Sequence, residues 1–512
     1  PDYRDKRAPR RVGRVLGRAA RPGDGREARS RRLHGRLSVV RRTSPGAAPH
    51  LRQHARGDRR HRPLHPPGAL AVVRPAAPPV VVIGLDGGCG RLVRRWAEDG
   101  FLPVLRSLMA DGVYRPLETP ASVLHVSSWP SLYTGTYPGK HGVYYTVQPA
   151  PGLQGSRRFH EGIYGRPTFW KTLSNAGYRC GVLDATYTHP EEGFSGTQVF
   201  DWGTWAKYWK PMSVPSGALR ALRRACGGSP LPFDALQVGL SALGAEEMGE
   251  RLVRAAAAKT AAALWLLDRG PWDLFFFLYC ETHPAAHYCW PGRETGTEGA
   301  GRGEAFARLR HIYEEVDGGI GRVLDRAGRE ATVFVVSGAG VGPNRAGWHL
   351  LPEAMRRFGF LAAPPPPAEG AGGPPPKKGL VGRAKGLLRP ETRKAIAGRL
   401  PHGWRDAINR RLDSAGVDWA GTKAYCLPTD LEGCIRINMK GREPKGIVGP
   451  GDEFDRVARE IADALRTLVN PRTGRPAVRE VVFTDDRFPG ERRPYLPDLV
   501  VVWSDEADID EL

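Results

Sequence analysis

Short apolar runs and longer amphipathic stretches alternate along residues 79–512. The apolar runs have the length of buried β-strands, and we place them at 79–85, 180–183, 273–279, 331–337 and 498–503. Helical periodicity marks the longer stretches at 91–110, 249–268 and 304–326. A strand that is apolar throughout is typical of a parallel sheet covered on both faces. The pattern therefore predicts an α/β fold with a mostly parallel central sheet flanked by helices.

Two stretches interrupt this pattern. Residues 1–78 have no regular periodicity, and residues 364–420 combine two proline runs with a basic, helix-prone stretch at 380–411. We predict one folded domain over residues 79–512, with a Pro-rich and basic insert at about 364–420.

The positive charge is concentrated at the start of the chain. The formal net charge is +22, and residues 1–78 hold 21 of the Lys and Arg residues but only 5 of the Asp and Glu residues. The domain itself is thus only mildly basic, and we expect no specific nucleic-acid partner. Lys6 is the one lysine of this Arg-rich segment, which begins at Pro1 without a methionine. Three interpretations stay open: an artefact or fragment of translation, a disordered tail, or a nucleic-acid-binding arm.

Cysteine usage and hydropathy bear on the compartment. The seven cysteines are scattered and include no CxxC pair, which favours reduced thiols in a cytoplasmic protein. Apolar runs stay well short of the ~20 residues that span a bilayer, so we expect no transmembrane segment.

The first predicted strand ends in a candidate functional residue. Asp86 follows the run 80–85 and is followed by Gly87. Ligands of open α/β sheets bind at the carboxyl ends of the strands, so this carboxylate is placed for function. The alternative is that Asp86 caps the helix that follows.

Four ordered stretches resemble the type I phosphodiesterase/nucleotide pyrophosphatase family of the alkaline phosphatase superfamily. They are Ile83-Gly84-Leu85-Asp86-Gly87; Ser128-Trp129-Pro130-Ser131 with Pro138-Gly139-Lys140-His141-Gly142; Tyr279-Cys280-Glu281-Thr282 up to His287; and Gly441-Arg442-Glu443-Pro444 with Pro497-Asp498-Leu499-Val500-Val501. The resemblance implies a three-layer alkaline-phosphatase-like fold and a small-molecule phosphoester substrate. It also implies up to two zinc ions and a Ser or Thr nucleophile.

The resemblance assigns roles to particular positions. Asp86 matches the first metal carboxylate. The nucleophile position, ten residues before Gly135, holds His125, with Ser127 close by, and both are catalytic candidates. His283 and His287 stand where the family has an Asp and a His four residues apart. Residues at this spacing share one face of a helix, so both are candidate metal ligands.

Elsewhere the sequence departs from the family pattern. Where the family has Ser-Asp-His-Gly after a buried strand, this chain has Ser337-Gly338-Ala339-Gly340. The final family histidine is missing before Leu512, which we interpret as C-terminal truncation. The resemblance thus implies a metal-dependent phosphoester hydrolase with an incomplete metal site. The alternative is an inactive member of the family that binds an anionic ligand or a partner.

Three further polar residues have weaker assignments. We expect His141 to be a packing and hydrogen-bonding residue rather than a catalyst. Arg442 and Lys445 either meet an anionic group near the substrate mouth or belong to a solvated loop.

Overall fold

The computed structural model describes residues 78–149, 152, 156–158, 164–205, 210–231, 244–290, 301–362 and 417–512. The chain divides into two units, Pro1–Val73 and Arg74–Leu512, and the described residues belong to the second. The Arg-rich segment 1–78 lies outside the described residues except for Pro78. Most of the predicted insert at 364–420, with its helix at 380–411, lies outside them as well.

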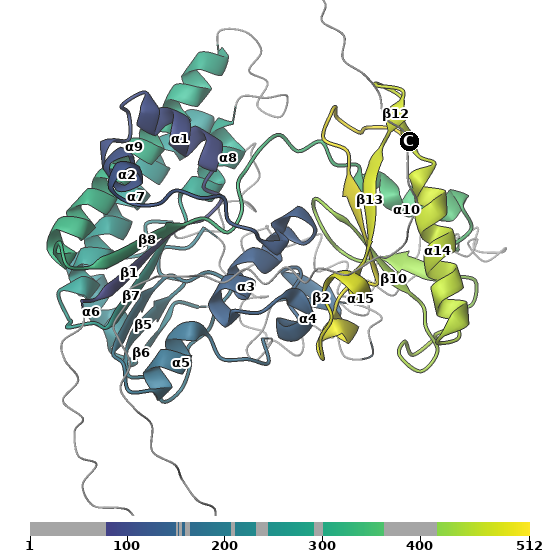
Figure 1. Cartoon of the computed structure of the whole chain (residues 1–512), viewed down its shortest axis with the longest axis horizontal. Coiled ribbons are helices and arrows are strands. Elements are labelled where there is room, and N and C mark those ends of the chain that lie inside the picture. The colour runs from purple at the N-terminus through teal and green to yellow at the C-terminus, as the bar shows by residue number, and fades with distance from the viewer. Residues whose placement is uncertain are drawn as a thin grey trace, which may run out of the picture. The chain divides into compact units, whose positions relative to one another are not determined.

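The larger described sheet has the strand order β6-β5-β4-β7-β1-β8 (Figure 1). Its strands are β1 (Val80–Leu85), β4 (Cys180–Leu183), β5 (Gly196–Phe200), β6 (Met212–Val214), β7 (Leu274–Tyr279) and β8 (Thr332–Val336). All neighbouring pairs are parallel except β5 and β6, which are antiparallel at one edge. The predicted mostly parallel sheet is confirmed.

Helices cover both faces of this sheet. They are α1 (Gly90–Glu98), α2 (Pro103–Asp111), α3 (Ser128–Thr134), α5 (Phe169–Asn175), α6 (Ala218–Cys226), α7 (Ala245–Leu267), α8 (Thr282–Cys289) and α9 (Gly301–Ala327). The predicted helices at 249–268 and 304–326 are α7 and α9, each of which begins a few residues earlier than expected.

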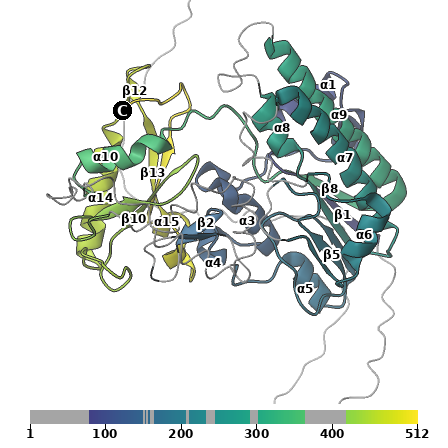
Figure 2. The same cartoon turned by 180° about the vertical axis from the view of Figure 1, so that it is seen from behind.

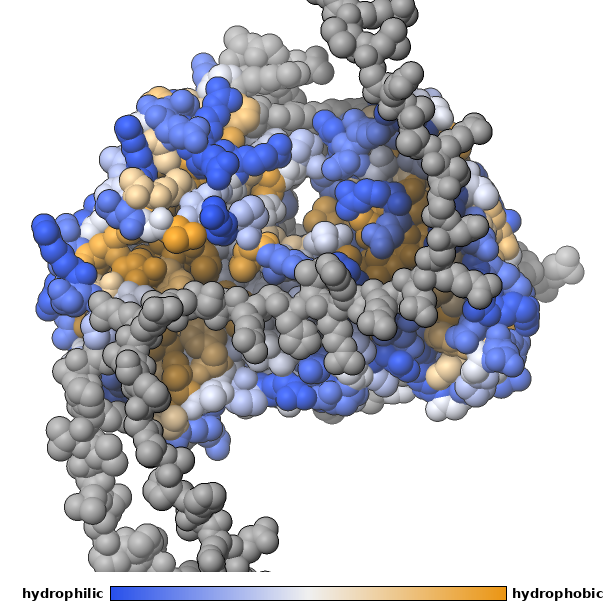
Figure 3. Space-filling view, in the orientation of Figure 1, coloured by the Kyte–Doolittle hydropathy of each residue, from blue (hydrophilic) through white to orange (hydrophobic). Residues whose placement is uncertain are grey.

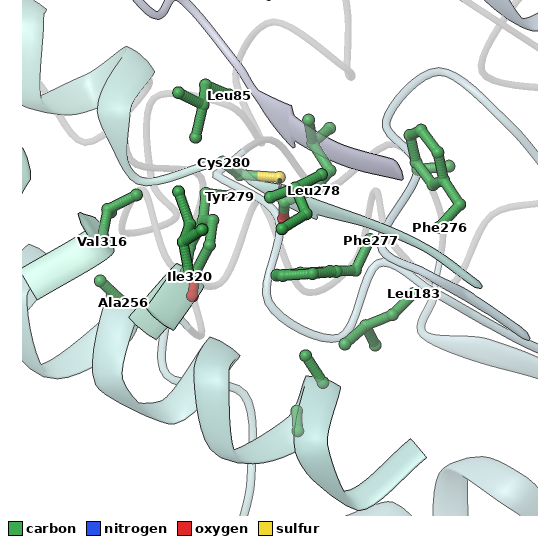
Figure 4. Close-up of a cluster of buried hydrophobic side chains, with 14 of the residues drawn as sticks. Leu85, Leu183, Ala256, Phe276, Phe277, Leu278, Tyr279, Cys280, Val316 and Ile320 are labelled. Atoms are coloured by element: carbon green, nitrogen blue, oxygen red, sulfur yellow. Dashed lines mark hydrogen bonds between the residues drawn. The ribbon is translucent and has the colours of Figure 1, made fainter. Parts of the chain in front are cut away.

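Strand β7 shows how the three layers form, because successive side chains on a strand point to opposite faces. Phe276 packs against Tyr133 of α3 and Trp170 of α5. Tyr279 points the other way, toward α7 and α9, and its hydroxyl is 2.7 Å from that of Thr260 (Figure 4). All six residues of β7 are buried, as expected for a strand enclosed between two helical layers.

The single helix predicted at 91–110 is wrong, because the structure has α1 and α2 there. Gly100, with a φ of +87°, follows α1 in a conformation that glycine adopts readily. Pro103 lies in the first turn of α2, where its missing N–H costs no helical hydrogen bond. The Asp317 carboxylate accepts the N–H groups of Val104 and Leu105, which fixes the start of α2.

The predicted strand at 498–503 is present as β14 (Leu499–Trp503) but lies outside the parallel sheet. It belongs to an antiparallel sheet of order β13-β14-β10-β9 (Figure 2). The other strands are β9 (Ala424–Cys426), β10 (Gly433–Ile437) and β13 (Val478–Phe483), and α14 (Asp452–Arg466) packs on this sheet. A fully buried apolar strand does not reveal its partners, so the sequence alone could not assign it to a sheet.

Shorter helices and strands complete the described part of the chain. The helices are η1 (Pro120–Ser122), η2 (His125–Ser127), α4 (Pro138–His141), η4 (Trp348–Leu350), α10 (Leu351–Arg357), α15 (Thr484–Arg487) and η5 (Arg493–Tyr495). The strands are β2 (Val147–Pro149), β3 (Ser156–Arg158), β11 (Val469–Asn470) and β12 (Arg475–Pro476).

Exposed hydrophobic side chains and membrane-spanning helices bear on possible binding partners. Hydrophobic side chains reach the surface over edge strand β8, where Phe334 is 50% exposed (Figure 3). No helix within the described ranges is long and apolar enough to cross a membrane.

Candidate functional site

Asp86 lies at the carboxyl end of β1, and its side chain is almost fully buried. The indole Nε1–H of Trp129 donates to Oδ1 over 2.7 Å, and that of Trp205 donates to Oδ2 over 2.6 Å. The N-cap of α1 is Cys89, without a side-chain cap, so the alternative that Asp86 caps this helix is wrong.

The surroundings of Asp86 favour its ionised form. Burial alone would raise the pKa of this carboxyl. The positive charge of His283 and hydrogen bonds from His283, Trp129 and Trp205 outweigh burial and hold the pKa below its usual value. Asp86 is therefore a buried anion stabilised by nearby donors.

The two candidate metal histidines, His283 and His287, lie on α8 directly after β7. Nδ1 of His283 is 3.2 Å from Oδ2 of Asp86, and its Nε2 is 3.1 Å from Nε2 of His287. The Trp205 ring packs on the imidazole of His283, with centroids 4.4 Å apart. A hydrogen bond between two ring nitrogens requires one of them to have a free lone pair, so at least one imidazole is neutral. The structure thus brings Asp86, His283 and His287 together.

His125, the residue at the family's nucleophile position, lies on η2 and pairs with Glu432. Its Nδ1 is 2.9 Å from both carboxylate oxygens of Glu432, and its backbone N–H donates to Oε1 over 2.8 Å. Its Nε2 is 3.4 Å from Oδ1 of Asp430. Burial lowers the pKa of His125, but the charges of Glu432 and Asp430 outweigh this effect and raise it to about 9. His125 is therefore an imidazolium at neutral pH.

The two serines near this position donate to backbone carbonyls. Ser127 is fully buried and donates to the carbonyl of Val143 over 2.7 Å. Ser128 donates to the carbonyl of His125 over 2.6 Å. Within the described part of the chain, neither hydroxyl donates to a histidine or carboxylate that would act as a base.

The loop after β8, where the family has two further ligands, carries no metal-binding side chain at positions 338 and 339. Ser337 donates back to the carbonyl of Ala339 over 2.9 Å. A Cβ atom on Gly338 would lie 2.9 Å from Cβ of Ser128 and 3.5 Å from the ring of Trp129. The space that a side chain at position 338 needs is already filled.

Comparison with known proteins decides the family. The family model for type I phosphodiesterase/nucleotide pyrophosphatase matches residues 80–368, more than half of the chain. The chain belongs to this family of phosphoester hydrolases. The family expected from the motifs is confirmed.

Searches against individual proteins add the following. No curated protein matches significantly. Two similar solved structures are of phosphonoacetate hydrolase from Sinorhizobium meliloti 1021, one in complex with phosphonoacetate and one with phosphonoformate. For each, the identity is 15%, the TM-score is 0.46, and the match covers 84% of this chain and 81% of the other.

The residues present do not fit the two-metal site that the family resemblance implies. Among the residues that the structure describes, no group of three or more His, Cys, Asp or Glu side chains is arranged to hold a metal ion. Both oxygens of Asp86 face indole N–H groups, which are donors only and cannot coordinate a cation.

The partners that determine this arrangement carry no clear signal in the sequence. Trp129 lies within a motif already noticed, but buried tryptophans are usually core residues. Trp205 follows β5 in the stretch Asp201-Trp202-Gly203-Thr204-Trp205, which carries no known pattern. Glu432 is 307 residues from His125 in the sequence.

Two weaker assignments can also be compared with the structure. His141 is fully buried, accepts the N–H of Val143 at Nδ1 and contacts Ser131 through Nε2, which confirms a packing and hydrogen-bonding role. Arg442 forms a two-pronged pair with Asp498 and contacts Glu443. Its guanidinium is therefore committed to internal carboxylates.

Proposed function

We propose that this chain is a member of the phosphodiesterase family that binds a small phosphoester without two-metal hydrolysis. The observation that carries the proposal is the state of Asp86. The family resemblance implies that this carboxylate holds a metal ion. In this structure, both of its oxygens instead accept hydrogen bonds from indole N–H groups. The first ion of a two-metal mechanism would have to compete with both indole donors for this carboxylate.

The groups at the nucleophile position support the same proposal. A nucleophile needs a free lone pair at neutral pH and usually a neighbouring base. The raised pKa of His125 keeps its ring protonated, and Glu432 and Asp430 face its two nitrogens. Ser127 and Ser128 donate to carbonyl groups instead of to a base.

The same neighbourhood contains a cationic side chain. His125 is protonated and forms ion pairs with Glu432 and Asp430. The negative charge of Asp86 is offset by three donors. Membership of a phosphoester hydrolase family supports a phosphoester as the ligand, and we expect His125 to contribute to its binding.

Metal-dependent hydrolysis is the second candidate, and one observation favours it. The Nε2 atoms of His283 and His287 are 3.1 Å apart, a separation at which two imidazoles can share one zinc ion. A catalytic zinc site also needs a third protein ligand. Asp86 meets His283 through Nδ1, on the other side of the ring from Nε2, and so does not supply it.

Ligand binding and turnover, measured on the full chain, separate the two candidates. The binding probe is p-nitrophenyl phosphate, titrated calorimetrically in EDTA and again with zinc. The turnover probe is bis-p-nitrophenyl phosphate with added zinc. We expect binding that survives EDTA and weakens in His125→Gln, with no zinc-dependent turnover. Zinc-dependent turnover that His287→Ala removes would establish the hydrolase instead.

We also propose a cytoplasmic location. All seven cysteines, each within the described ranges, are free thiols. Free thiols are typical of a reducing compartment. Mass spectrometry of the alkylated native protein would contradict this location if it found cysteine pairs protected as disulfides.

A further inference from the structure

The side chains of Trp129 and Trp205 hold Asp86 from two sides, and we call this pair the indole clamp. Each indole donates to a different oxygen of the carboxylate, at 2.7 and 2.6 Å. Both tryptophans are more than nine-tenths buried. Hydrogen bonds of this length to an ionised acceptor are charge-assisted, and they stabilise negative charge much as a bound cation would.

We propose that the indole clamp takes the place of the metal ion at Asp86 and keeps divalent cations away from this carboxylate. The inference deepens the proposed function and rests on it, because it explains how the site holds its buried anion without two metal ions.

The space around Trp129 supports this inference. The Trp129 ring lies between Gly84 of β1 and Gly338, which follows β8. A Cβ on Gly84 would lie 3.0 Å from the Trp129 ring, and one on Gly338 would lie 3.5 Å from it. A side chain at position 338 would also lie only 2.9 Å from Cβ of Ser128. The residues next to Gly84 and Gly338 are thus packed closely around the indole.

The position of Trp205 is fixed by a second buried carboxylate, Asp184. Asp184 follows β4 and accepts the backbone N–H groups of Trp202 and Gly203, both over 2.8 Å. Its other contact is an ion pair with the fully buried Lys259 of α7. These contacts hold the turn that leads into Trp205, so its N–H is directed at Asp86 before any ligand arrives.

A cation at Asp86 competes with these donors for the carboxylate. Indole N–H hydrogens carry partial positive charge and point at both oxygens, and Nδ1 of His283 lies 3.2 Å from Oδ2. Zinc binding at Asp86 would therefore meet repulsion from these partly positive hydrogens unless a buried tryptophan rotates away. Removing an indole donor should free a lone pair of the carboxylate beside His283 and make a new cation site.

The test measures zinc affinity by competition with a chromophoric chelator. The variants are Trp205→Phe, Trp129→Phe and the double variant, each with and without Asp86→Asn. Trp170→Phe is the matched control, because Trp170 is a buried indole that donates to another carboxylate, Glu191, over 2.7 Å. Phenylalanine keeps most of the ring and removes the donor.

We expect Trp205→Phe to raise zinc affinity by about tenfold or more, since the cation no longer has to displace a charge-assisted hydrogen bond. Asp86→Asn should abolish the gain, and Trp170→Phe should behave as wild type. Unchanged zinc affinity in a folded Trp205→Phe protein would overturn the inference. So would zinc binding by the wild type that Asp86→Asn removes.

A second measurement does not depend on folding of the tryptophan double variant. In nitrogen-15 NMR spectra of the indole N–H groups, Asp86→Asn should move two signals, those absent from the Trp129→Phe and Trp205→Phe spectra. Excess zinc should leave both signals of the wild type in place, and their displacement by zinc would contradict the clamp.

The two proposals fail in different ways. Zinc-dependent turnover that is insensitive to Asp86→Asn would overturn the proposed function and leave the clamp intact. A wild type without turnover whose zinc affinity is unaffected by loss of either indole would overturn the clamp alone.

Discussion

Asp86 and Asp184 are buried carboxylates that directly follow parallel strands of one sheet, yet they are neutralised in different ways. Asp184 has a full counter-charge, the ammonium of Lys259, and two backbone N–H donors. Asp86 has two indole donors and the edge of an imidazole. The fold thus stabilises Asp184 with a buried ammonium, and Asp86 with an imidazole and two neutral indole donors.

Within the described ranges, a third buried carboxylate has neither an ion pair nor indole donors, and its pKa differs accordingly. Glu281 follows β7, is fully buried, and has no hydrogen-bond partner for its two oxygens among the residues that the structure describes. Burial raises its pKa to about 7. The comparison teaches that an imidazole and two indole donors, without a metal ion, keep the pKa of a buried carboxylate such as Asp86 low.

The largest expected effect is on stability, from breaking the ion pair. Lys259→Met leaves Asp184 buried without its counter-charge and should lower the free energy of unfolding by about 3–5 kcal/mol. Urea denaturation measures the loss. The double variant Lys259→Met/Asp184→Asn should recover part of it, because no buried charge is then left unpaired. A loss below about 1 kcal/mol in the single variant would show that the pair is unimportant.

A smaller effect is expected from pH, through the pair of His125 and Glu432. The pKa of His125 is raised from 6.5 to about 9, so its contribution to stability is complete below pH 6.5 and is lost as the pH rises toward 9. We expect the free energy of unfolding to fall by about 2 kcal/mol over this window, after allowance for the 23% exposure of the imidazole.

The contribution of Glu432 has the opposite pH dependence. Its pKa is lowered, so its stabilising effect is present above its usual value of 4.5 and is lost as the pH falls.

In His125→Gln the fall in the free energy of unfolding between pH 6.5 and 9 should disappear. Parallel stability curves for wild type and His125→Gln would contradict this assignment.

The smallest effect is expected at Asp86. In Asp86→Asn the amide oxygen still accepts one indole hydrogen, so the free energy of unfolding should fall by only about 1–2 kcal/mol. The same substitution at Asp184 leaves the Lys259 ammonium unpaired and should cost about 3–5 kcal/mol. Equal losses in the two variants, measured side by side in urea, would show that the partners of Asp86 and the ion pair of Asp184 do not differ in their effect on stability.

The sequence predicted the fold where local pattern decides it. The apolar run before Asp86 placed β1 and the carboxylate at its end, and the spacing of His283 and His287 placed both on α8. The break between α1 and α2 was missed, although Gly100 and Pro103 signal it. The assignment of β14 to a separate sheet depends on pairing with β10 and β13, which no local pattern reveals.

Of the candidate site, the sequence predicted only the residues that the family resemblance assigns. Asp86, His283 and His287 do meet, because the ends of adjacent parallel strands converge at one edge of the sheet. The residues that alter the chemistry of this site are of types that the family motifs do not include. Indole donors are seldom considered as partners of a metal-binding carboxylate, and Glu432 reaches His125 only through tertiary folding.

The most direct test of the central claim, that Asp86 binds indole donors and no cation, is a crystal structure grown with excess zinc. The anomalous signal at the zinc absorption edge locates any bound ion independently of the refined protein atoms. We expect no anomalous peak within coordination distance of Asp86, with Nε1 of Trp129 and of Trp205 both at hydrogen-bond distance from its oxygens. A zinc peak bonded to Asp86, with either indole turned away, would contradict the account.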